Sequence, residues 1–270
     1  MSSPVNPYRP PEATVLDMRE PRGELHFRLP GVRVEAGRGA SWIGEGWTLF
    51  TAAPVMWIVL LLLFFAISFV IGLVPVLGNV GGVLLGPVFA VGIMSFAQGL
   101  AAGEEADIGR FFTGFREKLG PLVAVGALYM VMLIALFAIT GVLAFVVLGG
   151  VSLASMADPE QAAQALLAGG LGLGLLLVVL VFFLLFALIV SAYWYAPGLV
   201  FFAGAGVMEA FGESLKASLR NWLPLLVYGL LALFVLLLGT LAVFVGLLVA
   251  MPVLMGGYYA SFRDIFGADT

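Results

Sequence analysis

The sequence has no cysteine and a single histidine, His26, and only 10% of its 270 residues are charged. The absence of cysteine excludes disulfides, a thiolate nucleophile and a thiolate metal site. His26 precedes all the apolar runs, so we interpret it as an exposed polar residue rather than as a ligand or a catalytic group. These absences leave little of the chemistry that enzymes use. We therefore expect no catalytic residue, no cofactor and no metal site.

Apolar residues are what the chain has in excess. They make up 62% of the sequence, and the mean hydropathy is +1.14, whereas soluble domains are about 45–50% apolar and about 25% charged. Residues 46–103 and 221–262 contain no charged side chain. Each run is too long for one helical crossing of a hydrocarbon core of about 30 Å, so each must fold back. The composition therefore predicts an all-α polytopic membrane protein.

Six transmembrane helices, arranged as three hairpins, account for these runs. They are expected near residues 54–74, 83–102, 121–148, 170–203, 223–239 and 244–260, within a membrane domain of residues 41–270. The turn between the fifth and sixth spans is placed only broadly, between Gly239 and Gly246. Residues 1–40 are rich in proline, arginine and glutamate. This composition predicts a largely disordered arm that orders on binding, with a short hairpin around Pro30–Gly31 between residues 24 and 35.

An amphipathic segment precedes each hairpin, and residues 207–224 give the clearest example. At about 100° per residue, its apolar side chains share one helical face and its charged ones the opposite face. The apolar set is Met208, Phe211, Leu215, Leu219 and Trp222, and the charged set is Glu209, Glu213, Lys216 and Arg220. Pro54, Pro121 and Pro224 then begin the odd-numbered spans, where a missing N–H costs little. We predict a unit of one interfacial helix plus one hairpin, used three times.

The charges predict an orientation. Under the six-span arrangement all 12 lysine and arginine residues lie on one side, and the opposite loops carry only Asp158 and Glu160. Basic residues are enriched on the cytoplasmic side of membrane proteins. We therefore expect a multi-pass protein of the bacterial cytoplasmic (inner) membrane with both termini in the cytoplasm.

Three motifs carry a resemblance to a known family. They are residues 39–50 with Pro54 and Trp57, the segment Leu219–Gly229 (LRNWLPLLVYG), and the ending Tyr258–Phe266 (YYASFRDIF). Together they resemble a family of proteobacterial six-helix inner-membrane proteins, whose tail usually has tyrosine where this chain has Phe262. The resemblance implies a bacterial inner-membrane location and a six-helix fold, and no activity. More distantly, the repeated hairpins are similar to the membrane domain of some glycerophosphodiester phosphodiesterases, whose catalytic domain is absent from this sequence.

No ionisable residue falls within an expected span, which argues against an ion-coupled transporter. The tryptophan and tyrosine side chains gather instead in the half of the bundle that carries the positive charges. They either anchor that interface or line a crevice, bent at Pro197 and Pro252, that takes an apolar tail or a lipid headgroup. The candidate lipid or partner contacts are Trp194, Tyr195, Arg220, Trp222, Tyr258, Tyr259 and Arg263.

Two classes of function therefore stay open. The first is a non-enzymatic scaffold or regulatory partner that acts at the cytoplasmic leaflet, and the second is a protein that binds or transports a lipid or a small neutral solute. Membrane lipids are expected partners in both cases. A protein partner at the cytoplasmic face and a homo-oligomer are further alternatives, whereas a nucleic-acid partner is not expected.

Overall fold

The computed structural model describes residues 26–158, 160, 163–164, 170–241 and 245–268, and these residues are almost entirely helical. The elements, in chain order, are β1 (His26–Phe27), α1 (Arg38–Ala52), α2 (Pro54–Gly72), α3 (Leu77–Ala101), the 3-10 helix η1 (Ile108–Phe112), α4 (Thr113–Glu117), α5 (Leu119–Ala157), α7 (Gly170–Trp194), α8 (Ala196–Phe202), α9 (Val207–Arg220), α10 (Trp222–Leu241), α11 (Leu247–Phe266) and β2 (Gly267–Ala268). The expected all-α fold is confirmed.

Among the described residues, five segments are long and apolar enough to cross a membrane, namely Pro54–Gly72, Gly78–Ala101, Leu119–Gly149, Gly172–Phe202 and Trp222–Leu241. The sixth expected span corresponds to α11, which has 20 residues and is mostly buried among other helices. The chain is thus a polytopic membrane protein. The helices at these two expected spans are α10, which ends at Leu241, and α11, which begins at Leu247.

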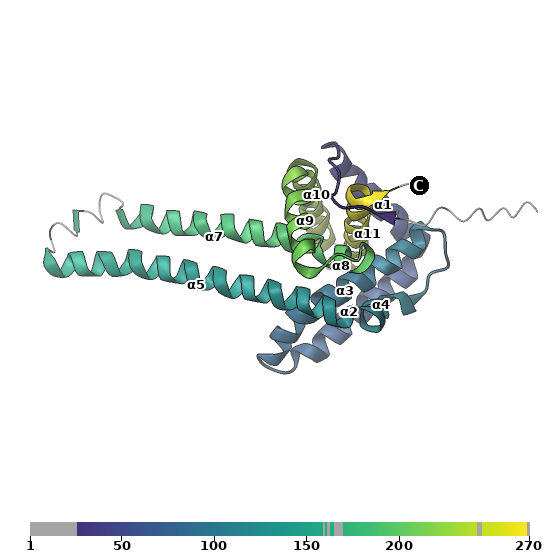
Figure 1. Ribbon diagram of the computed structural model, residues 1–270, viewed down its shortest axis with the longest axis horizontal. Helices are drawn as coiled ribbons and strands as arrows, with labels where there is room; N and C mark the ends of the chain where they lie inside the picture. Colours follow the sequence, from purple (N-terminus) through teal and green to yellow (C-terminus); the bar gives the residue numbers. More distant parts are fainter. Residues whose placement is uncertain (1–25, 159, 161–162, 165–169, 242–244, 269–270) are drawn as a thin grey trace, which may run out of the picture.

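The helices form two parts, a cluster and a projecting hairpin (Figure 1). In the cluster, α1, α2, α3, α10 and α11 pack on one another, while α5 and α7 extend away from it side by side. The 39 residues of α5 give a length of about 58 Å at 1.5 Å per residue, well beyond the roughly 30 Å hydrocarbon core. The expected third span therefore ends inside a longer helix.

Glycines let α1 lie directly on α11. A Cβ atom on Gly46 would lie 2.0 Å from the Val253 carbonyl oxygen and 2.7 Å from the Gly257 nitrogen. Small residues allow this close approach between backbones, which is a common way for helices to associate in membranes. The expected first amphipathic segment is therefore α1, but it packs into the bundle instead of lying only on its surface. Trp42 and Trp57 are consequently fully buried.

The other two amphipathic segments also differ from simple surface helices. The second forms η1 and α4 rather than one helix, and Phe111 is buried with its ring 5.6 Å from that of Phe89 on α3. The third, α9, has three faces instead of two. Its exposed apolar side chains include Met208 and Leu219, its charged residues lie on a second face, and a third face of small residues is buried. That third face comprises Ala210, Ser214, Ala217 and Ser218.

The hairpin expected between residues 24 and 35 is wrong. His26 and Phe27 pair instead with Ala268 and Gly267, so the N-terminal strand is antiparallel to the end of the chain. The arm continues along the bundle, where the Asn221 amide donates to the Val32 carbonyl at 2.9 Å and accepts from the Val34 N–H at 2.9 Å. Residues 26–37 are therefore held by the membrane domain. The expected disorder of residues 1–25 lies outside the described residues.

Candidate ligand crevice

A break between α7 and α8 creates the site. Pro197 has no N–H to continue the helical ladder, and the helix ends at Trp194 before α8 restarts at Ala196. The expected single span of residues 170–203 is thus two helices. Pro197 was the sequence signal for this bend, and the structure places the break directly in front of it.

Side-chain hydroxyls satisfy the backbone groups that the break releases. Ser214 Oγ donates to the Ser191 carbonyl at 2.8 Å and accepts from the Tyr195 N–H at 3.0 Å, while Ser218 Oγ donates to the Ser191 carbonyl at 3.1 Å. Unsatisfied backbone groups are costly in a membrane, so these serines explain why α9 buries its small face against the end of α7. From α11, the Tyr258 hydroxyl donates to the Trp194 carbonyl at 2.5 Å.

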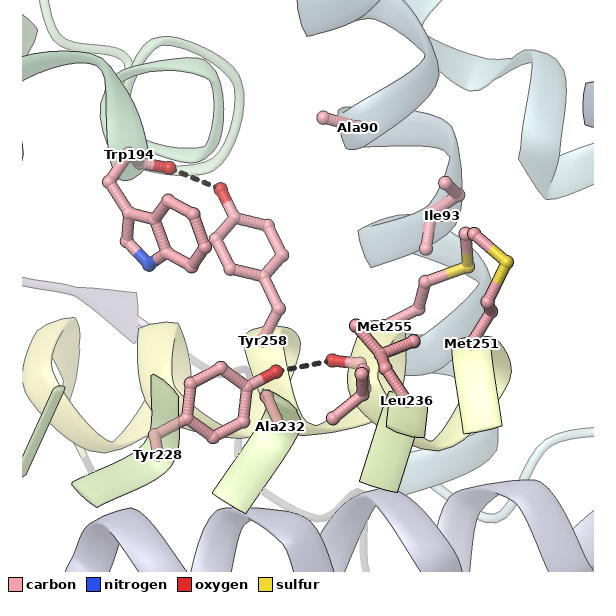
Figure 2. A pocket seen from close by; sticks show the side chains of 10 residues that line it. Ala90, Ile93, Trp194, Tyr228, Ala232, Leu236, Met251, Met255 and Tyr258 are labelled. Atoms are coloured by element: carbon pink, nitrogen blue, oxygen red, sulfur yellow. Dashed lines mark hydrogen bonds between the residues drawn. The ribbon is translucent and has the colours of Figure 1, made fainter. Parts of the chain in front are cut away.

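An apolar crevice lies beside this break, between α10 and α11 on one side and α3 and the end of α7 on the other (Figure 2). Its volume is about 380 Å³, within the 300–1,000 Å³ range of typical ligand sites. The lining residues are Ala90, Ile93, Trp194, Tyr228, Ala232, Leu236, Met251, Leu254, Met255 and Tyr258. Most of them are partly exposed. The crevice is therefore open at the surface of the helical bundle.

A second cavity of about 270 Å³ adjoins the first. It shares Trp194, Tyr228 and Ala232 with the crevice and extends between α7, α9 and the start of α10, where Ser191 and Ser218 line it. The shared residues belong to α7 and α10, so the two cavities follow the gap between these helices. Together the two cavities form one elongated groove rather than a round pocket.

The polar atoms of the crevice are mostly satisfied by the protein itself. The Tyr228 hydroxyl donates to the Leu254 carbonyl at 2.7 Å, and Tyr258 donates to Trp194 as described above; Figure 2 draws both bonds. Trp194 Nε1 is buried and has no partner among the described residues. No lining residue is charged. The walls therefore suit an apolar ligand, with methionine side chains that adapt to its shape.

A cluster of four charges joins α1 to α11 at the other end of α11. Arg38 Nε donates to Asp264 Oδ2 at 2.6 Å and Arg38 Nη2 to Glu45 Oε1 at 2.6 Å, while Arg263 Nη2 donates to Glu45 Oε2 at 2.7 Å. Trp42 Nε1 also donates to Asp264, at 3.0 Å. The hydrogen bond to Asp264 raises the pKa of Arg38 above its ordinary value. The cluster therefore ties α1 to α11 through side chains.

The candidate residues from the sequence are distributed over several environments. Trp194 and Tyr258 line the crevice, whereas Tyr195 and Tyr259 are buried in the core. Three others lie elsewhere: Trp222 is exposed at the start of α10, Arg220 Nη1 donates to the Gly31 carbonyl at 2.8 Å, and Arg263 belongs to the charge cluster. The structure thus brings only part of the expected set together.

Sequence reasoning missed the aliphatic and methionine walls of the crevice. Tyr228, Ala232 and Leu236 follow one another every four residues, which places them on one face of α10. Met251 and Met255 have the same spacing on α11. This pattern could have indicated a shared face. However, in a span that is apolar on all sides it does not distinguish a crevice wall from a surface that faces lipid.

Among the described residues, no group of three or more histidine, aspartate or glutamate side chains could hold a metal ion. The site instead suits ligand binding. It combines an apolar cavity, the Trp194 indole and two tyrosines, Tyr228 and Tyr258, whose hydroxyls donate to backbone carbonyls.

Two comparisons relate this architecture to known proteins. The profile of a family described as "Predicted integral membrane protein (DUF2189)" matches residues 73–196, from the turn before α3 to the start of α8. The chain is also similar to a probable inner membrane protein of Burkholderia thailandensis, with 28% identity over 210 residues that cover 74% of each chain. No solved structure matches the chain. Both matches agree with an integral membrane protein, and neither bears on the resemblance to glycerophosphodiester phosphodiesterases.

Proposed function

We propose that this protein is an inner-membrane lipid-binding protein whose crevice takes the acyl chain of a membrane lipid. The observation that supports this most is the crevice of about 380 Å³ beside the α7–α8 break, lined entirely by uncharged residues. A closely packed bundle would have favoured the scaffold function. A crevice that opens between spans favours a ligand that already resides in the membrane.

The orientation belongs to the same proposal. The charge cluster, the arm and α9 lie at the end of the bundle where the basic residues gather, and the positive-inside rule favours the cytoplasmic side for that end. The crevice begins near Trp194 and Tyr258 and runs toward Met251. A lipid of the inner leaflet would then enter with its headgroup near α9 and its chain between α10 and α7.

Photo-crosslinking tests this proposal. The purified protein is reconstituted with a phosphatidylcholine that carries a diazirine in the middle of one acyl chain, irradiated, digested and mapped by mass spectrometry. We expect labels concentrated on Leu236, Met251 and Met255, because these side chains line the crevice away from the interface. Labels spread evenly over lipid-facing positions such as Leu237 would contradict the proposal.

Two neighbouring substitutions supply the control. Ala232→Phe places a ring in both cavities, since Ala232 lines each of them. Leu233→Phe adds a ring on the adjacent face, where Leu233 is 66% exposed. We expect the first variant to lose most of the crevice labels and the second to keep them. Equal labelling of both variants would show that the acyl chain of the lipid does not bind between α10 and its neighbouring helices.

A further inference from the structure

Another cavity, about 250 Å³ in volume, lies on the far side of α11 from the crevice and includes two members of the charge cluster. It is lined by Glu45, Thr48, Leu49, Ala52, Leu100, Ala101, Ala260 and Arg263. Four of these come from one face of α1, since their spacing of three, four and seven residues repeats the helical turn. We propose that this cavity binds the headgroup of a phosphatidylethanolamine, with its phosphate on Arg263 and its ammonium on Glu45.

Arg263 has the capacity to bind a phosphate. Of its five guanidinium N–H donors, those on Nη2 serve Glu45, and Nη1 and Nε are in no hydrogen bond among the described residues. Its side chain is 37% exposed, so these donors reach the cavity. A planar guanidinium with free donors can bind a phosphate through two parallel hydrogen bonds.

Glu45 provides the complementary charge. Its two oxygens accept one hydrogen bond each, from Arg38 and from Arg263, and a carboxylate has about four acceptor positions. A primary ammonium could therefore donate to Glu45 without displacing either arginine. The choline group carries no N–H and cannot make this bond.

The charges favour a headgroup that is neutral overall. Arg38 and Arg263 balance Glu45 and Asp264 within the cluster, so an anionic lipid finds no net positive charge. Beyond the end of α3, Glu104 pairs with Arg110, and Glu105 and Asp107 add negative charge. Electrostatic attraction therefore disfavours phosphatidylglycerol, whereas the phosphate and ammonium of phosphatidylethanolamine compensate each other.

The apolar residues that line the rest of the cavity suit the glycerol and the first acyl carbons of a lipid, next to its headgroup. Leu49, Ala52, Leu100 and Ala101 are apolar and come from the ends of α1 and α3. Trp47, on the same helix as Glu45, is 52% exposed, which is typical of an indole at the membrane interface. The cavity thus combines a pair of opposite charges with an apolar floor at the depth where headgroups lie.

Native mass spectrometry of the whole protein tests the proposal. Phosphatidylethanolamine, phosphatidylcholine and phosphatidylglycerol with identical acyl chains are titrated separately, so that chain binding in the crevice contributes equally to all three. We expect phosphatidylethanolamine to bind about tenfold more tightly than either of the others, since the ammonium–carboxylate bond is charge-assisted. Equal apparent Kd values for the three lipids would overturn the proposal without any substitution.

Variants assign the preference to the cavity. Arg263→Gln should weaken phosphatidylethanolamine binding about tenfold, and Arg263→Lys should weaken it less. Arg116→Gln should leave it unchanged, because Arg116 is an exposed arginine whose one hydrogen bond among the described residues goes to the Gly109 carbonyl. A preference that persists in a folded Arg263→Gln variant would contradict the assignment. In Ala232→Phe the preference should remain even if chain binding in the crevice is lost, which separates the two sites.

Discussion

Replacing Gly46 by alanine tests the contact between α1 and α11. The new Cβ atom would lie 2.0 Å from the Val253 carbonyl oxygen, and real Cβ contacts are essentially never closer than 3.0 Å. The helices must therefore separate by about 1 Å, because the opposing atom is backbone and cannot rotate away. Overpacking of this kind typically costs about 1–3 kcal/mol. The same shift would also strain the Arg38–Asp264 and Arg263–Glu45 ion pairs, which bridge these two helices.

Gly44→Ala is the matched control, because no atom lies within 4 Å of a Cβ at Gly44, on the same helix. We expect this variant to be as stable as the parent or more stable, since alanine favours helix by up to about 1 kcal/mol. Unfolding with increasing sodium dodecyl sulfate in mixed micelles, followed by circular dichroism, measures the difference. Equal midpoints for the two variants would refute the close packing of α1 on α11.

Three further predictions concern the break, the arm and the orientation. Tyr258→Phe removes the donor to the Trp194 carbonyl and should lower the free energy of unfolding by about 1 kcal/mol in the same assay. Asn221→Ala removes the side chain that holds the arm and should speed proteolysis within residues 26–37. In this cysteine-free chain, Asp158→Cys should react with an impermeant maleimide only from the periplasm, and Lys216→Cys only from the cytoplasm.

Different results contradict each of these predictions. An unchanged midpoint for Tyr258→Phe would mean that the Trp194 carbonyl finds another donor. Cleavage of the arm at the parent rate in Asn221→Ala would show that the Asn221 amide does not hold it. Labelling of Asp158→Cys from the cytoplasm would reverse the proposed orientation.

The all-α membrane fold could be predicted because a membrane imposes strict conditions on the sequence. Uncharged runs must cross the hydrocarbon core as helices, since each backbone group needs a partner within its own segment. Prolines then mark where helices begin or break, and Pro54 indeed stands at the first position of α2. Pro197 likewise stands just after a real interruption, between Trp194 and Ala196. The similarity of the three expected repeat units stays a prediction.

The contacts between distant segments could not be predicted. Arg38 and Asp264 are 226 positions apart, and no local pattern connects them. The small face of α9 was overlooked because Ser214 and Ala217 are neither strongly apolar nor charged, so a two-sided amphipathic pattern hides them. The crevice could not be predicted for the same reason. In the sequence, Ala232 does not differ from any other residue of an apolar span, and the space beside it is seen only once the break between α7 and α8 is known.

A structure determined in lipid nanodiscs would test the central claim most directly. We predict the density of one acyl chain between α10 and the end of α7, in contact with Trp194, Ala232 and Met255. The opposite result would be α10 closed onto α7 in the nanodisc, with Tyr228 and Trp194 in direct contact and no chain between them. That result would contradict a lipid-binding crevice.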